Sequence, residues 1–385
     1  MLNFQFSNPT RIVFGEGTIA ELGGLVDADA RILVLYGGRS AEKNGTLAEV
    51  RTALAGHTVF EFGGVEPNPS FETLMRAFAL VRAEKIDFLL AVGGGSVIDG
   101  AKFVAAAAKY AGDAWDILAT MGACVRDALP LGAVLTLAAT GSEMNFNAVV
   151  TRKATRTKAF FASPLVFPKF SILDPTRTYT LPARQLANGV VEAFTHVMEQ
   201  YLTHPVGALV QDRFAEGLLQ TLIEVGPKVV HEPADYTSRA NLMWAATMAL
   251  NGLIGAGVPQ DWATHLIGHE LTAIHGLDHG QTLAVLLPSM LRIRREAKKE
   301  KLLQYAARVW QITSGTDEER IDLAIEKTRG FFEGLGVATR LSGYGIGADA
   351  IDGLIERLRE HGMTGLGERG DVTLEVSRAV YEASL

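Results

Sequence analysis

Short apolar runs alternate with segments of helical periodicity through the first half of the chain. The runs are Arg31–Tyr36 (RILVLY), Phe88–Val92 (FLLAV) and Leu131–Leu137 (LGAVLTL), and each ends at glycine or small polar residues. Between them, residues 71–85 and 97–109 repeat apolar positions at helical spacing. Buried strands separated by helices of this length are typical of a parallel sheet covered on both faces. The pattern therefore predicts an α/β domain.

From about Leu181 helical periodicity replaces this alternation, and we expect no strand beyond it. The expected helices cover residues 183–202, 206–231, 235–256, 260–275, 297–313, 317–335 and 349–361. The pairs Asp174–Pro175 and Leu181–Pro182 mark the junction, so we place the boundary within 179–184. The prediction is an α/β domain over residues 1–181 and an all-helical domain over 182–385, with a broad interface where ligand clefts tend to form.

Composition narrows the function classes. The 385 residues are 48% hydrophobic and carry a net charge of −7, which argues against a nucleic-acid partner. The single cysteine, Cys124, excludes a disulfide framework and a thiolate-rich zinc site within one chain. We see no secretory signal pattern and no apolar run near the about 18 residues of a membrane span. We therefore expect a cytoplasmic protein that does not contact membranes.

A glycine-rich segment, Ala91–Lys102 (AVGGGSVIDGAK), follows the second apolar run. Three glycines and Ser96 precede a helix that carries Asp99 in its first turns. Such glycines let the backbone approach a ligand, and a helix N-terminus favours an anion. Ile98 stands where the usual dinucleotide fingerprint has its third glycine. A phosphate site and a plain tight turn therefore both remain open.

A second cluster, Leu135–Asn145 (LTLAATGSEMN), repeats this arrangement after the third run. Thr140, Gly141, Ser142 and Asn145 supply small polar groups at a strand end, although a capped turn explains them equally. Two such loops at the ends of neighbouring strands favour convergence on one phosphate-bearing ligand.

The third loop, Gly37–Gly45 (GGRSAEKNG), bears on the choice of cofactor. Proteins that select NAD place a carboxylate near the adenine ribose, whereas those that bind NADP use basic or small hydroxyl side chains there. This loop has Arg39 and Ser40 and no acidic residue before Glu42. It favours NADP if it meets the ribose; the alternative is solvated surface charge.

Histidines gather in the second half in pairs. Glu192 and His196 are spaced i, i+4, as are His265 and His269, so each pair shares one helix face. His275 and His279 follow closely. Imidazole nitrogen and carboxylate oxygen are ligands for Zn²⁺ or Fe²⁺, although an isolated pair is more often a surface helix pair. The spacing HE-x4-H excludes the metalloprotease motif HE-x-x-H.

Several motifs in this order carry a family resemblance. GGGSVIDGAK, ATGSEMN, Asp174–Pro175 with Leu181–Pro182, GVVEAFTH and THLIGHELTAIHGLDHG together resemble the iron-containing (group III) alcohol dehydrogenase family. The resemblance covers essentially the whole chain and is strongest to the NADP-dependent aldehyde reductase and butanol dehydrogenase branch.

The resemblance implies an N-terminal Rossmann-like α/β dinucleotide-binding domain and an all-α C-terminal domain of the dehydroquinate synthase-like type, with the active site in the cleft. It implies hydride transfer between NADP(H) and small aliphatic aldehydes or alcohols, and a homodimer. It places His269 beside the metal as a proton-relay or nicotinamide-facing residue. The implied ligands of a Zn²⁺ or Fe²⁺ ion are Glu192, His196, His265 and His279. The implied NADP(H) residues are Gly38, Arg39, Ser40, Gly93, Gly94, Gly95, Ser96, Asp99, Thr136, Thr140, Asn145, Lys158 and Leu181.

Two positions depart from the family pattern. The usual carboxylate at position 192 is aspartate, and this chain has Glu192, whose additional methylene can shift the ion or change its coordination. Position 39 is arginine instead of the small residue common in the branch, and a cation opposite a phosphate is physically sensible.

Three alternatives remain. A glycerol dehydrogenase-like member or a dehydroquinate synthase-like cyclase would share the loops, but the apolar segment NGLIGAGVPQDWATH before the histidines favours simple aldehydes over an acidic substrate. The third is a nucleotide-binding regulatory module that has lost catalysis.

Overall fold

The computed structural model describes residues 1–232 and 234–385, which group into two compact units. The α/β unit comprises Ser7–Leu181 and Ala234–Thr247. The helical unit comprises Met1–Phe6, Pro182–Pro233 and Met248–Leu385. The chain thus changes unit at 181/182, but its first six residues and the segment 234–247 group with the opposite unit from the one their position suggests.

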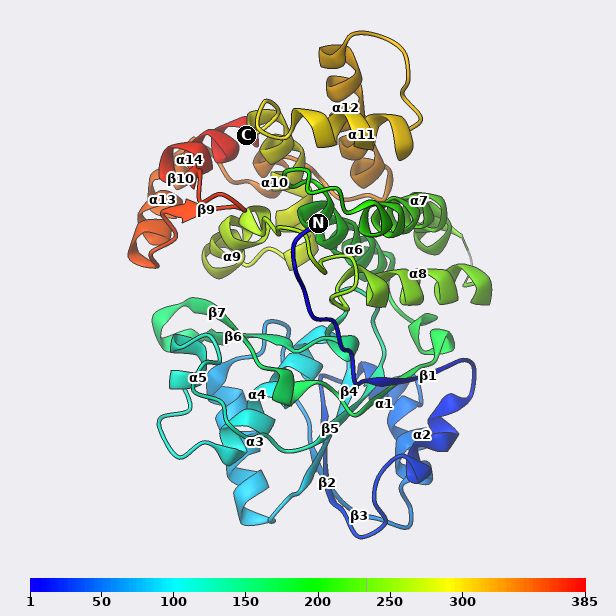
Figure 1. Ribbon diagram of the computed structural model, residues 1–385. Helices are drawn as coiled ribbons and strands as arrows, with labels where there is room; N and C mark the ends of the chain where they lie inside the picture. The colour runs from blue at the N-terminus through cyan, green and yellow to red at the C-terminus, as the bar shows by residue number, and fades with distance from the viewer. Residues whose placement is uncertain (233) are drawn as a thin grey trace. The chain divides into compact units, whose positions relative to one another are not determined.

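The α/β unit is built on a six-stranded parallel sheet with the strand order β1-β8-β5-β4-β2-β3 (Figure 1). Its strands are β1 (Arg11–Phe14), β2 (Arg31–Tyr36), β3 (Thr58–Phe62), β4 (Phe88–Gly93), β5 (Leu131–Leu135) and β8 (Phe170–Leu173). All residues of β4, β5 and β8 are buried. Fully buried central strands explain why the sequence reads there as continuous apolar runs.

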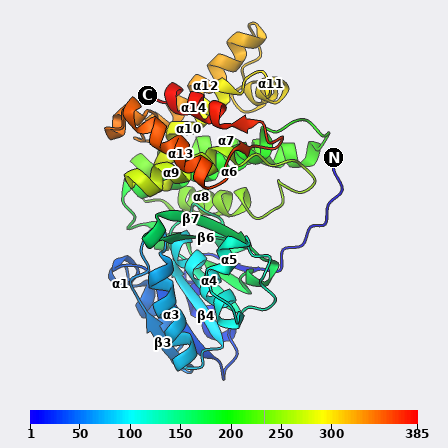
Figure 2. The ribbon, with the colours of Figure 1, turned by 90° about the vertical axis from the view of Figure 1, so that its left-hand side faces the viewer.

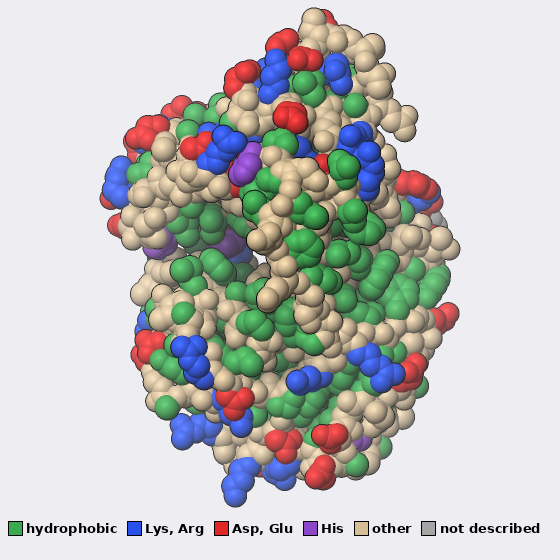
Figure 3. All heavy atoms as spheres, viewed as in Figure 1, with side chains coloured by type: hydrophobic (Ala, Val, Ile, Leu, Met, Phe, Trp, Pro, Cys, Tyr) green, Lys and Arg blue, Asp and Glu red, His purple; other side chains and the backbone are tan. Residues whose placement is uncertain are grey.

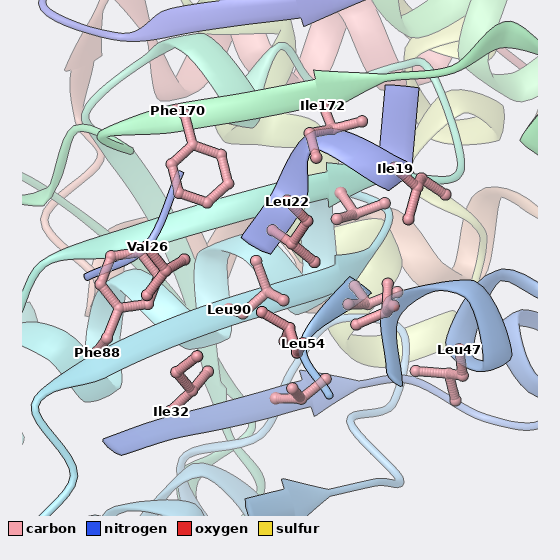
Figure 4. Close-up of a cluster of buried hydrophobic side chains, with 14 of the residues drawn as sticks. Ile19, Leu22, Val26, Ile32, Leu47, Leu54, Phe88, Leu90, Phe170 and Ile172 are labelled. Carbon is pink, nitrogen blue, oxygen red and sulfur yellow. The ribbon is translucent and has the colours of Figure 1, made fainter. Parts of the chain in front are cut away.

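Helices cover both faces of this sheet (Figure 2). On one face, Ile19 and Leu22 of the 3-10 helix Thr18–Gly24 and Leu47 of α2 (Thr46–Ala53) pack against β2 and β4 in a continuous core (Figure 4). On the other face, α4 (Gly95–Lys109) packs on β4 and against α3 (Phe71–Ala83).

The remaining parts of this unit are a hairpin and short helices. The antiparallel strands β6 (Asn147–Arg152) and β7 (Thr157–Ala162) form the hairpin, and β6 packs against α4. The short helices are α1 (Ser40–Lys43), α5 (Asp116–Ala119) and the 3-10 turns Ser142–Met144, Lys153–Thr155, Pro164–Val166 and Pro175–Thr178. Helix α8 (Tyr236–Ala249) also belongs largely to this unit.

The helical unit centres on α6, which packs against α7 and α10, with α10 in turn against α9. Its helices are α6 (Ala183–Tyr201), α7 (Leu209–His231), α9 (Ala263–His275), α10 (His279–Ile293), α11 (Lys299–Arg308), α12 (Asp317–Gly334), α13 (Ile351–Glu360) and α14 (Leu374–Ala383), with 3-10 turns at Leu341–Tyr344 and Ala348–Ala350. A core of apolar residues from α9, α10, α13 and α14 holds the C-terminal part together.

The main sequence predictions of the fold are confirmed, with local corrections. The expectation of no strand after Leu181 is wrong, because β9 (Gly365–Leu366) pairs with β10 (Val372–Thr373). Strands β1, β3 and β8 and helices α10 and α14 were not expected. Among the described residues, we find no helix whose length and apolar content would let it cross a bilayer.

Candidate functional site

Three of the predicted cofactor loops lie at one edge of the parallel sheet. Tyr36 pairs with Val92 and Gly93 pairs with Leu135, so β2, β4 and β5 end side by side. The segments at or directly after the ends of these strands hold Gly38–Ser40, Gly93–Ser96 and Thr136–Thr140, respectively. The carboxyl edge of an open parallel sheet is where such folds bind ligands.

Glycine lets two of these loops touch. A Cβ atom on Gly95 would lie 2.4 Å from the Thr140 hydroxyl oxygen, and one on Gly94 would lie 3.1 Å from Leu137 Cβ. Gly95 begins α4, a helix of 15 residues, with Gly94 as its extended N-cap. A backbone without side chains at a helix N-terminus presents N–H groups and the positive end of the helix dipole, as a phosphate site requires.

Two of the predicted cofactor residues are held in an internal network instead. Asp99 accepts a hydrogen bond from the Ser142 hydroxyl (2.6 Å) and another from the Val149 amide (2.9 Å). The fully buried Lys102 ammonium donates to Ser142 (2.8 Å), to Asn145 Oδ1 (2.9 Å) and to the carbonyl of Asn147 (2.8 Å). These bonds tie the second loop to the first two turns of α4.

Burial and the neighbouring charges set the protonation of this network. Burial lowers the pKa of Lys102 to about 8, against the opposing pull of Asp99 and Glu143. Burial also raises the pKa of Asp99, while Lys102 and, more weakly, Lys158 draw it down. The positive charge of Lys158, on β7, thus helps to lower the pKa of Asp99.

The other predicted cofactor residues divide by exposure. Thr136 is buried and its amide donates to the carbonyl of Gly93 (3.0 Å), whereas Gly38, Arg39 and Ser40 are exposed around the start of α1. Leu181 is half-buried, and its amide donates to Thr178 in the segment that follows β8.

Four histidines of the helical unit lie together. The ring of His265 on α9 is 4.7 Å from that of His196 on α6 and 5.1 Å from that of His279, the first residue of α10, measured between centroids. His269, one turn after His265, lies 5.5 Å from His279. Glu192 precedes His196 by one turn of α6 and is buried. His275, at the end of α9, is exposed and takes no part.

Close helix contacts bring these residues together. A Cβ atom on Gly280 would lie 2.6 Å from the carbonyl oxygen of Asn188 on α6, so α10 starts directly against α6 only because residue 280 lacks a side chain. The Asn188 side chain also donates to Asp278, which caps α10 (2.9 Å). The start of α10 is thereby fixed one turn before Glu192 and two turns before His196.

The orientation of His265 depends on a buried glutamate. Glu199 accepts from the backbone amide of Thr264 (2.6 Å), and its other carboxyl oxygen hydrogen-bonds to Nδ1 of His265. Burial and the carboxylate of Asp261 raise the pKa of Glu199 well above its usual value, while the donors of Thr264 and His265 favour its carboxylate form. The hydrogen bond at Nδ1 turns the Nε2 atom of His265 away from Glu199.

The donor chemistry of this cluster fits a divalent ion. Burial, and then the charge of His265, lowers the pKa of His196 well below its usual value, so this imidazole is neutral as a ligand must be. Nδ1 of His196 is buried and has no hydrogen-bond partner among the described residues. The rings of His196 and His265 lie nearly parallel, at 12°. In the described ranges, we find no group of three or more His, Cys, Asp or Glu side chains whose present positions could hold a metal ion.

Comparison with known proteins decides the family. The sequence-family model for iron-containing alcohol dehydrogenase matches residues 9–175. The family model for the C-terminal part of Fe-containing alcohol dehydrogenases matches residues 186–364. This chain belongs to the iron-containing alcohol dehydrogenase family. The resemblance inferred from the sequence motifs is thereby confirmed, and the protein is an oxidoreductase of the alcohol dehydrogenase class.

Full-length relatives agree with this family. The chain is 61% identical to the NADPH-dependent aldehyde reductase YqhD of Escherichia coli and 42% identical to a probable NADH-dependent butanol dehydrogenase of Bacillus subtilis, with 100% of each chain covered in both alignments. The solved structure of YqhD without substrate and cofactor superposes with a TM-score of 0.94 at 59% identity, covering 100% of both chains.

Sequence reasoning missed two residues of this iron-containing alcohol dehydrogenase. Lys102 was overlooked although it lies three residues after Asp99, and Glu199 was overlooked although it lies three residues after His196. Each spacing places the residue on the same helix face as its predicted neighbour. The periodicity of α4 and α6 could therefore have found both.

Proposed function

We propose that this chain is a metal-dependent, NADP(H)-linked alcohol dehydrogenase that reduces small aliphatic aldehydes. The observation that carries the proposal is the cluster of His196, His265 and His279, three imidazoles from three different helices, of which those of His196 and His265 are buried. A structural histidine needs no such neighbours, whereas a catalytic metal site takes three or four of these donors.

The cofactor follows from the loops at the sheet edge. Gly93, Gly94, Gly95 and Ser96 would hold the pyrophosphate at the start of α4, and the exposed Arg39 and Ser40 would meet a ribose 2′-phosphate. The name of YqhD states NADPH and that of the Bacillus relative states NADH, so family membership alone does not decide between the two. The basic and hydroxyl side chains at 39 and 40 favour NADPH.

Glu192, His196, His265 and His279 would hold the ion, Fe²⁺ or Zn²⁺. When bound, the ion supplies a Lewis acid that polarises the carbonyl and stabilises the developing alkoxide. The burial of Glu192, His196 and His265 would restrict water around the reacting carbon. His269 lies next to His279 and would relay the proton through its imidazole to the alkoxide oxygen.

A panel assay tests this function. Purified protein of known metal content is given NADPH or NADH with straight-chain aldehydes such as butanal. We expect NADPH oxidation that depends on the aldehyde and a clear preference for NADPH, and Arg39→Ala should lower that preference by weakening NADPH binding alone. Equal turnover with NADH would refute the role of Arg39 and Ser40, and absence of turnover with every aldehyde would refute the reductase.

We also propose a homodimer in the cytoplasm. Met1, Leu2, Leu209, Val210 and Phe214, all of the helical unit, are each about half exposed or more. Met1 lies against the start of α7, since its sulfur is 3.4 Å from Gln211 Nε2. Figure 3 shows hydrophobic side chains gathered on this face around the N-terminal segment. An exposed apolar patch of this kind marks an interface, and light scattering after gel filtration measures the assembly.

The single cysteine agrees with a reducing compartment such as the cytoplasm.

A further inference from the structure

Trp262 has a backbone conformation that is unfavourable for its side chain. Its φ is 61° and its ψ is 3°, in the left-handed region that glycine enters freely and large side chains rarely adopt. It is the N-cap of α9, one turn before His265. A bulky residue persists in such a conformation only where its surroundings enforce it, and such strain gathers at functional sites.

Neighbouring residues, not the indole, enforce the conformation. Asp261 donates its amide to the carbonyl of Glu199 (2.9 Å) and accepts from the amide of Ala263 (2.9 Å). Its second carboxylate oxygen is 2.6 Å from the buried ammonium of Lys298. The indole N–H donates only locally, to Gln260 Oε1 (2.8 Å), and Gln260 is exposed. The turn is therefore anchored on both sides of Trp262 without help from its ring.

The indole instead lies against the histidines. Its ring is 5.4 Å from that of His265 at 75° and 6.1 Å from that of His196 at 63°, so it meets both imidazoles edge to face. It is only half-buried, whereas Ala263 and Ile267, which follow it, belong to the core. A large apolar surface that is only partly buried thus lies beside the two proposed ligands.

We propose that Trp262 limits the size of the substrate, because its indole forms an apolar wall beside His196 and His265. The inference rests on the proposed reductase function. It explains why a strained tryptophan occupies a position where glycine would fit the backbone better. This apolar wall would favour a straight alkyl chain and disfavour aldehydes that are branched or aromatic next to the carbonyl.

Two substitutions distinguish a role of the indole in substrate selection from a role in stabilising the fold. Trp262→Gly removes the indole and suits the left-handed backbone, whereas Trp262→Phe keeps an aromatic wall of smaller size. For each variant we would measure the melting temperature, the metal content and the ratio of kcat/KM for benzaldehyde to that for butanal. A pocket contact of this size alters discrimination about tenfold or more. We therefore expect this ratio to rise about tenfold in Trp262→Gly and to change less in Trp262→Phe.

The stability of Trp262→Gly is the decisive second readout. Because the substitution relieves strain, we expect an unchanged or higher melting temperature with unchanged metal content. An unchanged benzaldehyde-to-butanal ratio in an active Trp262→Gly variant would overturn the wall while leaving the reductase standing. A large fall in melting temperature with loss of metal would show that the indole is structural, which also overturns the wall. A wild-type protein without turnover on any aldehyde would overturn both proposals.

Discussion

The ammonium of Lys102 occupies a fully buried position between α4 and residues 142–147. At the scale of single residues, the proposed nucleotide site is stabilised by charged groups that need not contact the ligand. The family resemblance places Asp99 and Asn145 near the cofactor, and both side chains accept hydrogen bonds within this network. Their role includes fixing the loop that follows β5 against the loop that follows β4.

Lys102 predicts a pH dependence of stability. Its pKa falls from 10.5 in the unfolded chain to about 8 in the folded protein because of burial. Between these two pH values the unfolded state binds more protons than the folded state, so stability increases as pH rises from about 8 to 10.5. Relative to Lys102→Met, the wild-type free energy of unfolding should therefore gain up to about 3 kcal/mol over this range.

Denaturant unfolding at several pH values measures this gain. Lys109→Met is the matched control, since Lys109 ends the same helix with an exposed side chain. It should show no comparable trend against wild type. Parallel curves for wild type and Lys102→Met would mean that Lys102 is not the titrating group.

Glu199 predicts a change in metal affinity. Its carboxyl group fixes the ring of His265, and removing such an outer partner typically weakens metal binding 10–100-fold. An amide is a weaker acceptor for the imidazole N–H than a carboxylate. We expect Glu199→Gln to lower affinity for Zn²⁺ about tenfold or more in competition with a chelator. Glu224→Gln, on the exposed Glu224–Lys228 pair, serves as the control. Equal affinities of the two variants would remove Glu199 from the site.

Individual residues were predictable where the spacing along one helix carried the signal. Glu192 with His196 and His265 with His269 could be read from the sequence because an i, i+4 pair must share a face. The contacts of His265 with His196 and His279 could not, because they depend on how α6, α9 and α10 pack. The orientation of His265 depends on Glu199, which is 66 residues away in the chain.

At the scale of elements, the site rests on the approach of α10 to α6. Gly280→Ala places a methyl group against the Asn188 backbone, which cannot yield as a side-chain tip could. We expect a loss of about 1–3 kcal/mol in unfolding free energy, typical of overpacking, together with weaker metal binding because His279 moves. Both are measurable by denaturant unfolding and by metal competition.

Gly330→Ala is the control for that substitution. Gly330 lies inside α12, and a Cβ atom there would meet nothing within 4 Å. Alanine should therefore stabilise this helix by up to about 1 kcal/mol. If Gly280→Ala is as stable as Gly330→Ala and binds metal normally, the close approach does not position His279.

Whole elements were predicted best where an uninterrupted apolar run ends at glycines. Arg31–Tyr36 was predicted with its observed bounds because its apolar run is uninterrupted and ends at glycines. Strand β3 (Thr58–Phe62) was not predicted because it is a short edge strand that is only partly buried. Strand β1 was not predicted because it has four residues, of which one is buried. Helix α10 was not predicted because Gly276 and Gly280 lie near its start and Pro288 lies within it.

At the scale of the whole molecule, the surface carries charged side chains of both signs. The net charge is −7, and Figure 3 shows acidic and basic side chains interspersed over α11 and α12, where Lys299 pairs with Glu318 and Arg295 with Asp322. Exposed pairs of this kind contribute little to stability. The stability of each unit comes from its own buried apolar core.

The most direct test of the central claim is reconstitution of the metal-stripped protein. Fe²⁺ or Zn²⁺ is added back in steps while bound ion and NADPH-dependent reduction of butanal are measured on the same sample. The account predicts that activity is absent without metal, rises in proportion to bound ion and stops at one ion per chain, and that His265→Ala neither binds the ion tightly nor recovers activity. Undiminished butanal reduction by the stripped protein, or normal ion binding by His265→Ala, would contradict it.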